Sequence, residues 1–591
     1  YRSHSFPTRR SSDLFYFDYN FNGNLMFKIF LMFIYILLPL SISAEVGQIF
    51  VFKDLITLDE KLKNSPNAVY IKKGKFIKID KFNQLIKDFP ESEINRNYEN
   101  NIAVPGFIEH HIHPFLSSLT MNSKIISIDD WDLDGETSKG VLTNSDYISE
   151  LIKSFNEKGK EEIFITWGYH HYFHGEISRQ ILDEISSNKP ILIIHRSFHE
   201  FIMNSAAIDF FGINKIELNK IDEKIRENID IQEGHFSENG AFLVVPNLMK
   251  YFSKNNGFIN GLKKTVNYLH QNGITLISNP GSMPDRDLQN AKNYIFGAKT
   301  VPFKSYFIPN GMYLSSTFKD NLLEKTIEIN NWGEGKVQFL PNHIKLFIDG
   351  AMYSQNMIMS EGYIDGHQGV WLMEKDKYSE AFEFYWDNNY QIHIHQNGDG
   401  GLDYLLDILE KNLKRNPRND HRTTIVHFGY SRSNQIPRIK ELGAIVSANP
   451  YYITVLSDLY SKVGVGYSRS QEMVRLGDLV DNKVTFSLHS DMPMAPASPL
   501  QLMSSAVNRL NIANKVAGPN QKIEVINALK AVTINAAYVL ALEEDYGTIS
   551  SGKYANITIL DKNPLNIDPN SISNIKVIRS EERRVGKECE R

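Results

Sequence analysis

Two histidines spaced two residues apart are the first sign of chemistry in this sequence. His111 and His113 lie in the segment PGFIEHHIHPF, at the end of a predicted strand. Alternate residues of a strand point to the same side, so the two imidazoles can share a metal ion. A pair of polar residues at a strand end is the simpler alternative, so the interpretation depends on further ligands.

Three more residues of metal-binding type end later predicted strands. His395 lies in QIHIHQNGDG, His427 in TTIVHF and Asp491 in FSLHSDMP. In a barrel of parallel strands the carboxyl ends of distant segments converge, and catalytic groups lie there. These residues therefore predict, together with the histidine pair, a site for one or two divalent metal ions, with zinc as the expected metal.

Lys345, in HIKLFIDGAM, is the least expected residue of this group. It shares a side of its strand with His343 and Phe347, which predicts that it points into the barrel. A cation in that place is costly unless it is neutralised. Two interpretations stay open: a carbamate formed with carbon dioxide, which can bridge two metals, or an ion pair with Asp349 or Asp399.

Eight short apolar runs can supply the strands that position these ligands. Each is followed by a turn signal or a helical stretch, such as the leucine-rich Leu402–Leu413, which is the pattern of a parallel barrel. The runs are Ile102–His113, Ile274–Ser278, Pro302–Ile308, Ile344–Asp349, Gln391–His395, Thr423–His427, Ala444–Ala448 and Val484–His489. We therefore predict an α/β fold with a (β/α)₈ TIM barrel over residues 104–540.

Two additions to the barrel are predicted. The interval after the first strand is too long for one βα unit and contains strands of its own, IFITW and PILIIH, so an inserted α/β subdomain is expected at about 115–270. Insertions on this side of a barrel usually shape the substrate pocket. The β-rich segments 45–103 and 541–579 predict a small composite β-sandwich built from both ends of the chain.

Several polar and aromatic residues near these strand ends are candidate substrate contacts. Each has a structural alternative, either a packed turn or an aromatic core. Those after the His395 strand could also orient the histidines. The candidates are Trp167, His171, His199, Asn204, Asn397 and Asp399.

The composition limits the classes of binding partner that are expected. The 591 residues carry a net charge of -5 and show no basic segment, so a small-molecule substrate is expected and nucleic acid is not. A homo-oligomer stays open. The only cysteine is Cys589, which leaves no disulfide framework and no thiolate metal site.

The ends of the chain need separate treatment. Residues 26–44 have an early cation, an apolar run and small residues, the layout of a signal peptide, which predicts export to the periplasm or outside the cell. An uncleaved membrane anchor is the alternative. Residues 1–25, beginning YRSHSFPTRRSSDL, and 580–591, SEERRVGKECER, resemble translated sequencing-adapter remnants and are expected to lie outside the fold.

Taken together, the motifs resemble the amidohydrolase superfamily, and within it the exo-acting branch that includes N-substituted formamide deformylase. PGFIEHHIHP, IKLFIDG, HIHQNGD, LHSDMP and the tail NALKAVTINAAYVLALEEDYG occur in the expected order between Gly47 and Leu565. Two positions depart from the pattern: Val426 stands where many relatives have an acidic residue, and His489 where Gly is common. The groups that orient the ligands are therefore the least defined.

The resemblance implies a barrel with a composite sandwich, a set of metal ligands and a reaction. The implied ligands are His111, His113, His395, His427 and Asp491, with Lys345 as a carbamate. Metal-activated water would hydrolyse a carbon–nitrogen bond other than a peptide bond, most simply a linear amide such as an N-acyl or N-formyl amine. Asp491 would move the proton, and His427 is the second catalytic candidate.

Two alternatives to this function remain at the level of sequence. One is deamination of a nucleobase-like ring amidine at a mononuclear site, where Lys345 would not be carbamylated. The other is a metal-binding protein without catalysis, against which the retention of every ligand type argues.

Overall fold

The computed structural model describes residues 46–582 apart from 63–64, 134–135, 159–160 and 255. All of the described residues except Val46 belong to one compact unit. The predicted signal segment 26–44, the segment 1–25 and Cys589 lie outside the described residues. Among those described, no helix combines the length and apolarity needed to cross a membrane.

Two parallel sheets form the centre of this unit. The first has the order β18-β17-β16-β7 and the second β19-β20-β21-β22-β23. Single parallel bridges, Asn310 with Lys345 and Ile112 with Met492, connect the two sheets. The strands are β7 (Phe107–Glu109), β16 (Ile274–Ser282), β17 (Lys304–Pro309), β18 (Val337–Phe339), β19 (His343–Phe347), β20 (Gln391–Gln396), β21 (Thr424–His427), β22 (Ile445–Ala448) and β23 (Phe486–Leu488). Each of the eight predicted runs overlaps one of these strands.

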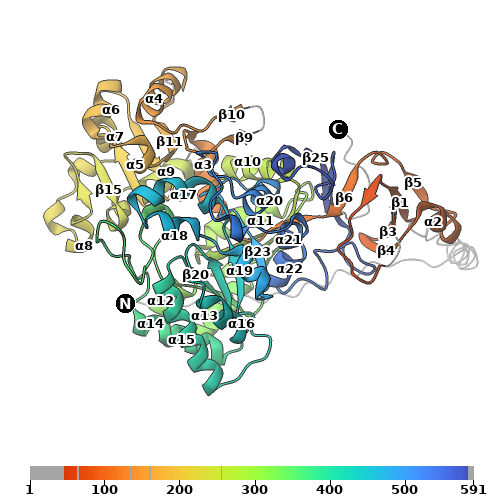
Figure 1. The fold of residues 1–591 in the computed structure, drawn as a ribbon. Coiled ribbons are helices and arrows are strands. Elements are labelled where there is room, and N and C mark those ends of the chain that lie inside the picture. The colour runs from red at the N-terminus through yellow and green to blue at the C-terminus, as the bar shows by residue number, and fades with distance from the viewer. Residues whose placement is uncertain (1–45, 63–64, 134–135, 159–160, 255, 583–591) are drawn as a thin grey trace, which may run out of the picture. The chain divides into compact units, whose positions relative to one another are not determined.

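Helices follow these strands and pack on them (Figure 1). The predicted helix Leu402–Leu413 lies inside α15, whose apolar side buries Leu402, Leu405 and Leu409. The helices of this region are α10 (Gly257–Gln271), α11 (Arg286–Phe296), α12 (Gly311–Thr317), α13 (Leu322–Asn330), α14 (Lys375–Asp387), α15 (Asp399–Arg415), α16 (Gln435–Glu441), α17 (Tyr451–Val463), α18 (Tyr467–Gln471), α19 (Leu476–Asp481), α20 (Pro499–Asn508), α21 (Val525–Ala531) and α22 (Ile534–Val539).

The first predicted strand is two strands in the structure. The run Ile102–His113 divides at Gly106 into β6 (Ile102–Pro105) and β7, which belong to different sheets. A Cβ at Gly106 would collide with the side chain of Thr275, so a larger residue would not fit this close approach. The prediction of one continuous strand was wrong because both halves are apolar and nothing in the pattern marks the change of sheet.

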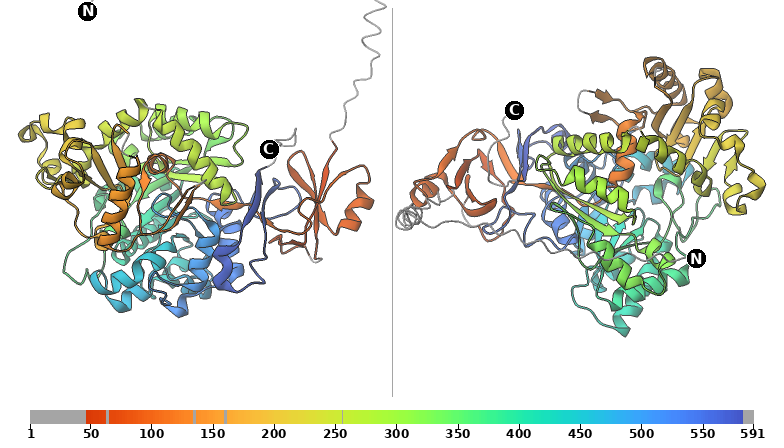
Figure 2. Two further views of the ribbon diagram at one scale, coloured as in Figure 1. Left: turned by 90° about the horizontal axis from the view of Figure 1, so that it is seen from above. Right: turned by 180° about the vertical axis from the view of Figure 1, so that it is seen from behind.

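Strands from both ends of the chain build a pair of small sheets. Their orders are β4-β3-β1-β5 and β2-β6-β24-β25, and β24 pairs antiparallel with β6 (Figure 2). Phe50, Val69 and Phe76 from the amino-terminal part share one core with Ile557 and Ile559. The strands are β1 (Gln48–Val51), β2 (Asp54–Leu55), β3 (Ala68–Lys72), β4 (Lys75–Asp80), β5 (Glu93–Asn95), β24 (Asn556–Leu560) and β25 (Val577–Glu582).

The last described strand corrects a prediction. Residues from 580 onward were expected to lie outside the fold, but Ser580–Glu582 are part of β25. Ser580 pairs with Thr558 and is buried, and its Oγ donates to the carbonyl oxygen of His270 at 3.3 Å. Strand pairing uses backbone groups, so almost any sequence can extend a strand.

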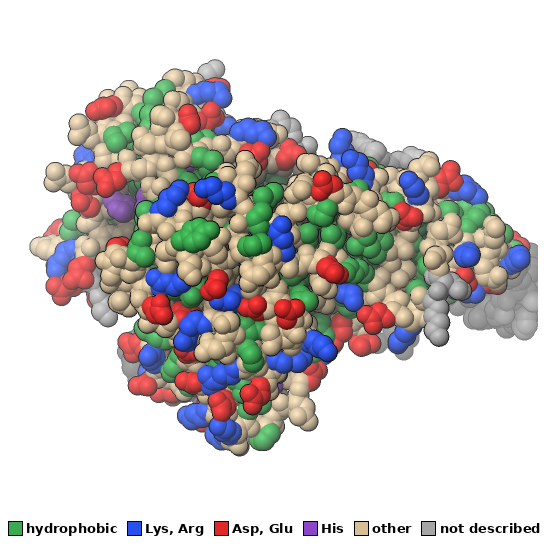
Figure 3. All heavy atoms as spheres, viewed as in Figure 1, with side chains coloured by type: hydrophobic (Ala, Val, Ile, Leu, Met, Phe, Trp, Pro, Cys, Tyr) green, Lys and Arg blue, Asp and Glu red, His purple; other side chains and the backbone are tan. Residues whose placement is uncertain are grey.

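The insertion has its own mixed sheet, in the order β14-β15-β13-β12-β11-β8. The strands β11 and β12 are parallel, with Phe164 opposite Ile191. On the face drawn in Figure 3, acidic and basic side chains are interspersed. The strands are β8 (Lys124–Ile125), β11 (Phe164–Tyr169), β12 (Ile191–His195), β13 (Glu200–Met203), β14 (Ile229–Asp230) and β15 (His235–Ser237); α4 (Asn144–Lys158), α5 (His171–His174), α6 (Arg179–Ile185) and α7 (Ser205–Phe210) are the accompanying helices.

Candidate metal centre

Backbone pairing holds the histidine pair between two neighbouring segments. After β7, the backbone N–H of Ile112 donates to the carbonyl oxygen of Ser278 at 2.9 Å, and that of His113 to Met492 at 2.8 Å. In return, the N–H of Asp491 donates to the carbonyl oxygen of His111 at 3.1 Å. Ligands that are far apart in sequence are thus fixed side by side.

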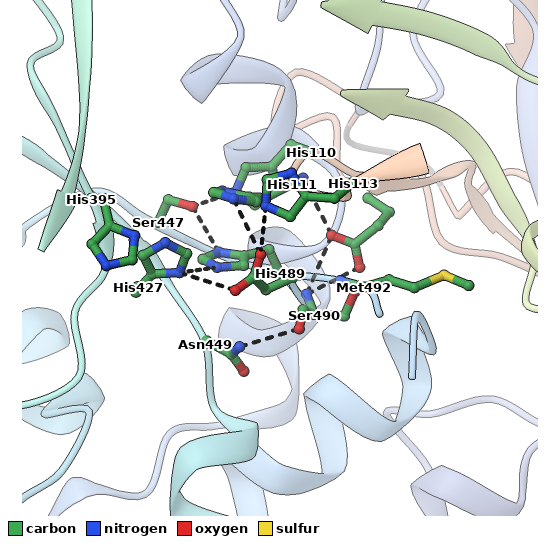
Figure 4. Close-up of polar contacts among 12 residues, drawn as sticks. His110, His111, His113, His395, His427, Ser447, Asn449, His489, Ser490 and Met492 are labelled. Atoms are coloured by element: carbon green, nitrogen blue, oxygen red, sulfur yellow. Dashed lines mark hydrogen bonds and ion pairs between the residues drawn. The ribbon is translucent and has the colours of Figure 1, made fainter. Parts of the chain in front are cut away.

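The structure brings the five predicted ligands together (Figure 4). Oδ1 of Asp491 lies 3.0 Å from Nε2 of His113 and 3.4 Å from Nε2 of His111. Oδ2 of the same carboxylate is 3.7 Å from Nδ1 of His427. The ring of His395 lies 4.4 Å from that of His427, centroid to centroid. Ligand atoms of His111, His427 and Asp491 all lie within 4.8 Å of one another.

The protonation of these groups fits a metal ion. Burial, with the charge of Lys345, lowers the pKa of His111 well below its ordinary 6.5, so the imidazole is neutral. Burial has the same effect on the pKa of His395 and of His427. Oδ1 of Asp491 is buried and receives no hydrogen bond from the described residues. Imidazole lone pairs facing a carboxylate oxygen are the donor set that a divalent cation satisfies.

Lys345 is buried beside this cluster. Its side chain is 1% exposed, and its Nζ makes no hydrogen bond with the described residues. Burial lowers the pKa of Lys345 to about 7, against an opposing effect of Asp491. A neutral amine at a metal site is the form of lysine that can react with carbon dioxide.

The predicted alternative for Lys345, an ion pair with Asp349 or Asp399, was wrong. The carboxylate of Asp349 accepts backbone N–H groups, including those of Asn397 and Gly398. Asp399 forms an ion pair with Arg432 at 2.9 Å. Both carboxylates therefore stabilise the loops around the site.

A hydrogen-bonded chain supports the ligands from behind. Nε2 of His489 lies 3.2 Å from Nδ1 of His427, and Nδ1 of His489 lies 2.9 Å from Oγ of Ser447. The same Oγ lies 2.7 Å from Nε2 of His110, and the ring of His489 stacks on that of His111. His489 is one of the two positions noted in the sequence as departing from the expected family pattern. Ser447 and His110 were missed, since a serine inside a strand carries no distinctive signal.

Glu109 is a further buried group that the sequence analysis missed. It is 1% exposed, and its carboxyl group accepts the backbone N–H groups of Ser490 and His111. Burial raises the pKa of Glu109 to about 8. Strand alternation could have revealed it, since Glu109 shares a side of the strand with His111 and His113.

Two of the ligands have a backbone that non-glycine residues avoid. His427 has a φ of 78° and Asp491 a φ of 62°, both in the left-handed region. Such a conformation costs about 1–3 kcal/mol and persists only where the surrounding structure enforces it. Strain of this kind is concentrated at functional sites.

Asn397 and Asp399 have different roles in the structure. Nδ2 of Asn397 lies 3.0 Å from Nε2 of His395 and donates to the carbonyl oxygen of Gly350 at 3.1 Å. Asn397 is therefore placed to orient His395. Asp399 is 1% exposed and bonded to Ser360 as well as to Arg432, which corrects its prediction as a substrate contact.

Two candidates from the insertion are structural. Trp167 is fully buried and packs against Trp131 and Phe198, in the core rather than on an accessible wall. Oδ1 of Asn204 caps α7 by accepting the N–H of Ala207, and it also accepts from Ile191. Its Nδ2 donates to two carbonyl groups, which leaves the side chain no capacity for a substrate.

The remaining two candidates are partly exposed. The side chain of His199 is 41% exposed and bonds to Oε2 of Glu238 at 2.9 Å. That of His171 is 34% exposed and lies in a second group with His170 and His195. Both are accessible to a ligand.

Comparison with known proteins finds a matching family model and related sequences. Residues 97–581 match the model of the amidohydrolase family. The protein LONG AFTER FAR-RED 3 of Arabidopsis thaliana is 24% identical over 513 residues, covering 84% of each chain. N-substituted formamide deformylase of Arthrobacter pascens is 23% identical over 507 residues, covering 83% of this chain and 89% of the relative.

A solved structure shares the fold. It is an uncharacterized metal-dependent hydrolase from Pyrococcus horikoshii OT3, with a TM-score of 0.67 and 21% identity. The likeness covers 88% of this chain and 99% of that one.

Proposed function

The chain belongs to the amidohydrolase family, and we propose that it hydrolyses a linear amide such as an N-acyl or N-formyl amine. It is a metal-dependent hydrolase that acts on carbon–nitrogen bonds. The proposal goes one step further and names the class of substrate. One of its relatives is by name a deformylase of N-substituted formamides, which is a linear-amide chemistry.

The observation that carries the proposal is the environment of Lys345. Its buried Nζ has no hydrogen-bond partner among the described residues and lies beside imidazoles and a carboxylate. Addition of the neutral amine to carbon dioxide forms an N–C bond and releases one proton, which leaves a carbamate anion. That anion would add oxygen ligands to the histidines and Asp491, enough for two metal ions. Two metals favour amide hydrolysis, whereas deamination of a ring amidine needs one.

The residues of the site divide the work of the reaction. His111, His113, His395, His427 and Asp491 would hold the metal, most simply zinc, with carbamylated Lys345. The metal supplies Lewis acidity that makes water nucleophilic near neutral pH. Asp491 takes a proton from the attacking water and delivers it to the leaving amine, so that an amide and water become a carboxylate and a protonated amine. His489 holds the orientation of His427 through its 3.2 Å contact.

We also propose that the parallel strands close into a (β/α)₈ barrel, in the order β7, β16, β17, β19, β20, β21, β22 and β23. The bridges Asn310–Lys345 and Ile112–Met492 support this closure, because they join the two sheets on both sides. A closed barrel explains why ligands from the first and eighth of these strands are neighbours.

The test combines a metal count with a product-release assay on purified chain. The assay covers a panel of N-formyl and N-acyl amines and ring amidines. We expect the chain to release amine from linear amides. We also expect two metal ions at this centre, both of which are lost when His111 and Asp491 are substituted. Ammonia release from ring amidines by a protein with one such ion would replace this proposal with deamination.

A further inference from the structure

The inserted subdomain contains a second group of histidines. His170 follows β11, and His195 ends the neighbouring parallel strand β12. His171 begins α5. One ring nitrogen from each of the three lies within 4.8 Å of those of the other two. The ring centroids are 5.4 to 5.6 Å apart, so each of the three rings is a neighbour of the other two.

These rings have buried nitrogens without partners. Both ring nitrogens of His170, Nδ1 of His171 and Nε2 of His195 are buried and make no hydrogen bond with the described residues. A buried polar atom that stays unpaired costs about 1–3 kcal/mol. The nearby His174 is different, because its Nδ1 accepts the N–H of His170 and its Nε2 bonds to the carbonyl oxygen of Val141. In this part of the insertion, the unpaired ring nitrogens therefore belong to the three clustered histidines and not to His174.

The charges around this group favour a cation. Burial lowers the pKa of His195 to about 3 and lowers that of His170 well below its ordinary 6.5, so both imidazoles are neutral and keep a lone pair. Oε1 of Glu200 lies 4.0 Å from Nδ1 of His171. The buried cation Arg196 is neutralised by Asp129 at 2.7 Å.

We propose that His170, His171 and His195 bind a divalent transition-metal ion in the inserted subdomain, with Glu200 as the neighbouring carboxylate. Three imidazoles and a carboxylate suit zinc and other late first-row ions. Binding through Nε2 would move the proton of His195 to Nδ1, which would then donate to Oγ of Ser197 at 2.7 Å instead of accepting the backbone N–H of Ser197 at 3.2 Å. Small side-chain rotations bring the nitrogens to the separation of about 3.4 Å that zinc–nitrogen bonds of about 2.0–2.1 Å require.

The site is accessible and has a structural consequence. The side chain of His171 is 34% exposed, so an ion can reach it from solvent. An ion there ties the carboxyl ends of β11 and β12 together. It therefore stabilises the insertion independently of the proposed reaction.

Equilibrium titration of the chelated full-length chain with Zn²⁺ tests the site, followed by the visible spectrum with Co²⁺. The double variant His171→Gln/His195→Gln should bind one ion fewer than the wild type and lose the Zn²⁺-dependent rise in Tm of the insertion. The variant His270→Gln, at a histidine outside both groups, should bind as many ions as the wild type. Asp491→Asn changes only the other centre, which separates the two sites.

The outcome that overturns the proposal is equal Zn²⁺ stoichiometry and affinity in the wild type and the double variant. Circular dichroism reports whether the double variant folds. If it does not, His171→Gln alone replaces it, because that partly exposed side chain can change without opening the core. A binding constant weakened at least tenfold by His171→Gln supports the site, and an unchanged constant refutes it.

Discussion

Asp491 is the residue that separates a catalyst from a metal-binding protein. The change Asp491→Asn keeps the shape of the side chain and removes its basic oxygen. Proton transfer by a positioned group contributes about a hundred- to ten-thousandfold, so kcat should fall by at least a hundredfold. The measurement is kcat for the amide identified in the release assay, with metal content determined on the same sample.

The metal content decides how this result is interpreted. A variant that has lost its ions only shows that Asp491 is a ligand, as its 3.0 Å distance from His113 implies. A variant with full metal content and near-normal turnover would contradict the assignment. The proton would then be carried by a histidine, with His427 and His489 as the candidates.

The environment of Lys345 predicts that the recovery of chelated protein with Zn²⁺ depends on bicarbonate and on pH. Its pKa of about 7 in the metal-free protein leaves roughly half of the amine neutral at pH 7, against about one part in three thousand at the ordinary 10.5. Because only the neutral amine reacts with carbon dioxide, recovery of chelated protein with Zn²⁺ should be faster with bicarbonate and should speed up from pH 6 to pH 8. The rate of recovered amide hydrolysis measures this. A recovery rate that is the same with and without bicarbonate would exclude the carbamate.

The metal-binding residues could be predicted because ligand chemistry restricts residue type and strand ends restrict position. His395 and His427 stand out for this reason. The supporting residues could not be predicted in the same way. Ser447 is an ordinary strand residue until the fold places His489 and His110 against its hydroxyl. The unpaired state of Lys345 also depends on where Asp349 and Asp399 find other partners.

At the scale of elements, Asn204 joins α7 to the sheet of the insertion. Its Oδ1 accepts two backbone N–H groups and its Nδ2 donates to two carbonyl groups, at the start of the helix. Asn204→Ala leaves these buried groups unpaired, so the free energy of unfolding should fall by about 2–4 kcal/mol. Denaturant unfolding with tryptophan fluorescence measures the change.

Asp285 provides a matched control for this prediction. It caps α11 through a single bond to Leu288 in an exposed setting. Asp285→Ala should therefore cost about 0.5–2 kcal/mol. If Asn204→Ala lowers the free energy of unfolding by no more than this and also raises KM, Asn204 is a substrate contact after all.

The limits of prediction at this scale have a physical reason. Apolar runs predicted the strands of the two parallel sheets, because strands covered on both faces need continuous apolar sequence. They did not reveal the break at Gly106, where β6 and β7 enter different sheets. Both β6 and β7 are buried, so both have the same kind of continuous apolar sequence. The close approach of Gly106 to Thr275 exists only in the folded chain.

At the scale of the whole molecule, the two ends of the chain depend on each other. Phe50 and Val69 share a core with Ile557. The β-rich composition of both ends predicted this assembly, but composition could not show how far the last strand extends. Ser580–Glu582 pair through backbone groups, which leave no signature in residue types.

Truncation of the carboxyl end tests this last strand. A chain that ends at Arg579 loses the partners of Thr558, Ile557 and Asn556 in β24. The opened edge exposes backbone groups and removes buried Ser580, so the free energy of unfolding should fall by at least about 1 kcal/mol. An uncovered strand edge also promotes association between chains. Calorimetry should therefore show a lower Tm, and size-exclusion chromatography more aggregate, than in a control chain that ends at Glu582. Equal Tm values for the two chains would mean that Ser580–Glu582 contribute nothing to the sheet, as the sequence alone predicted.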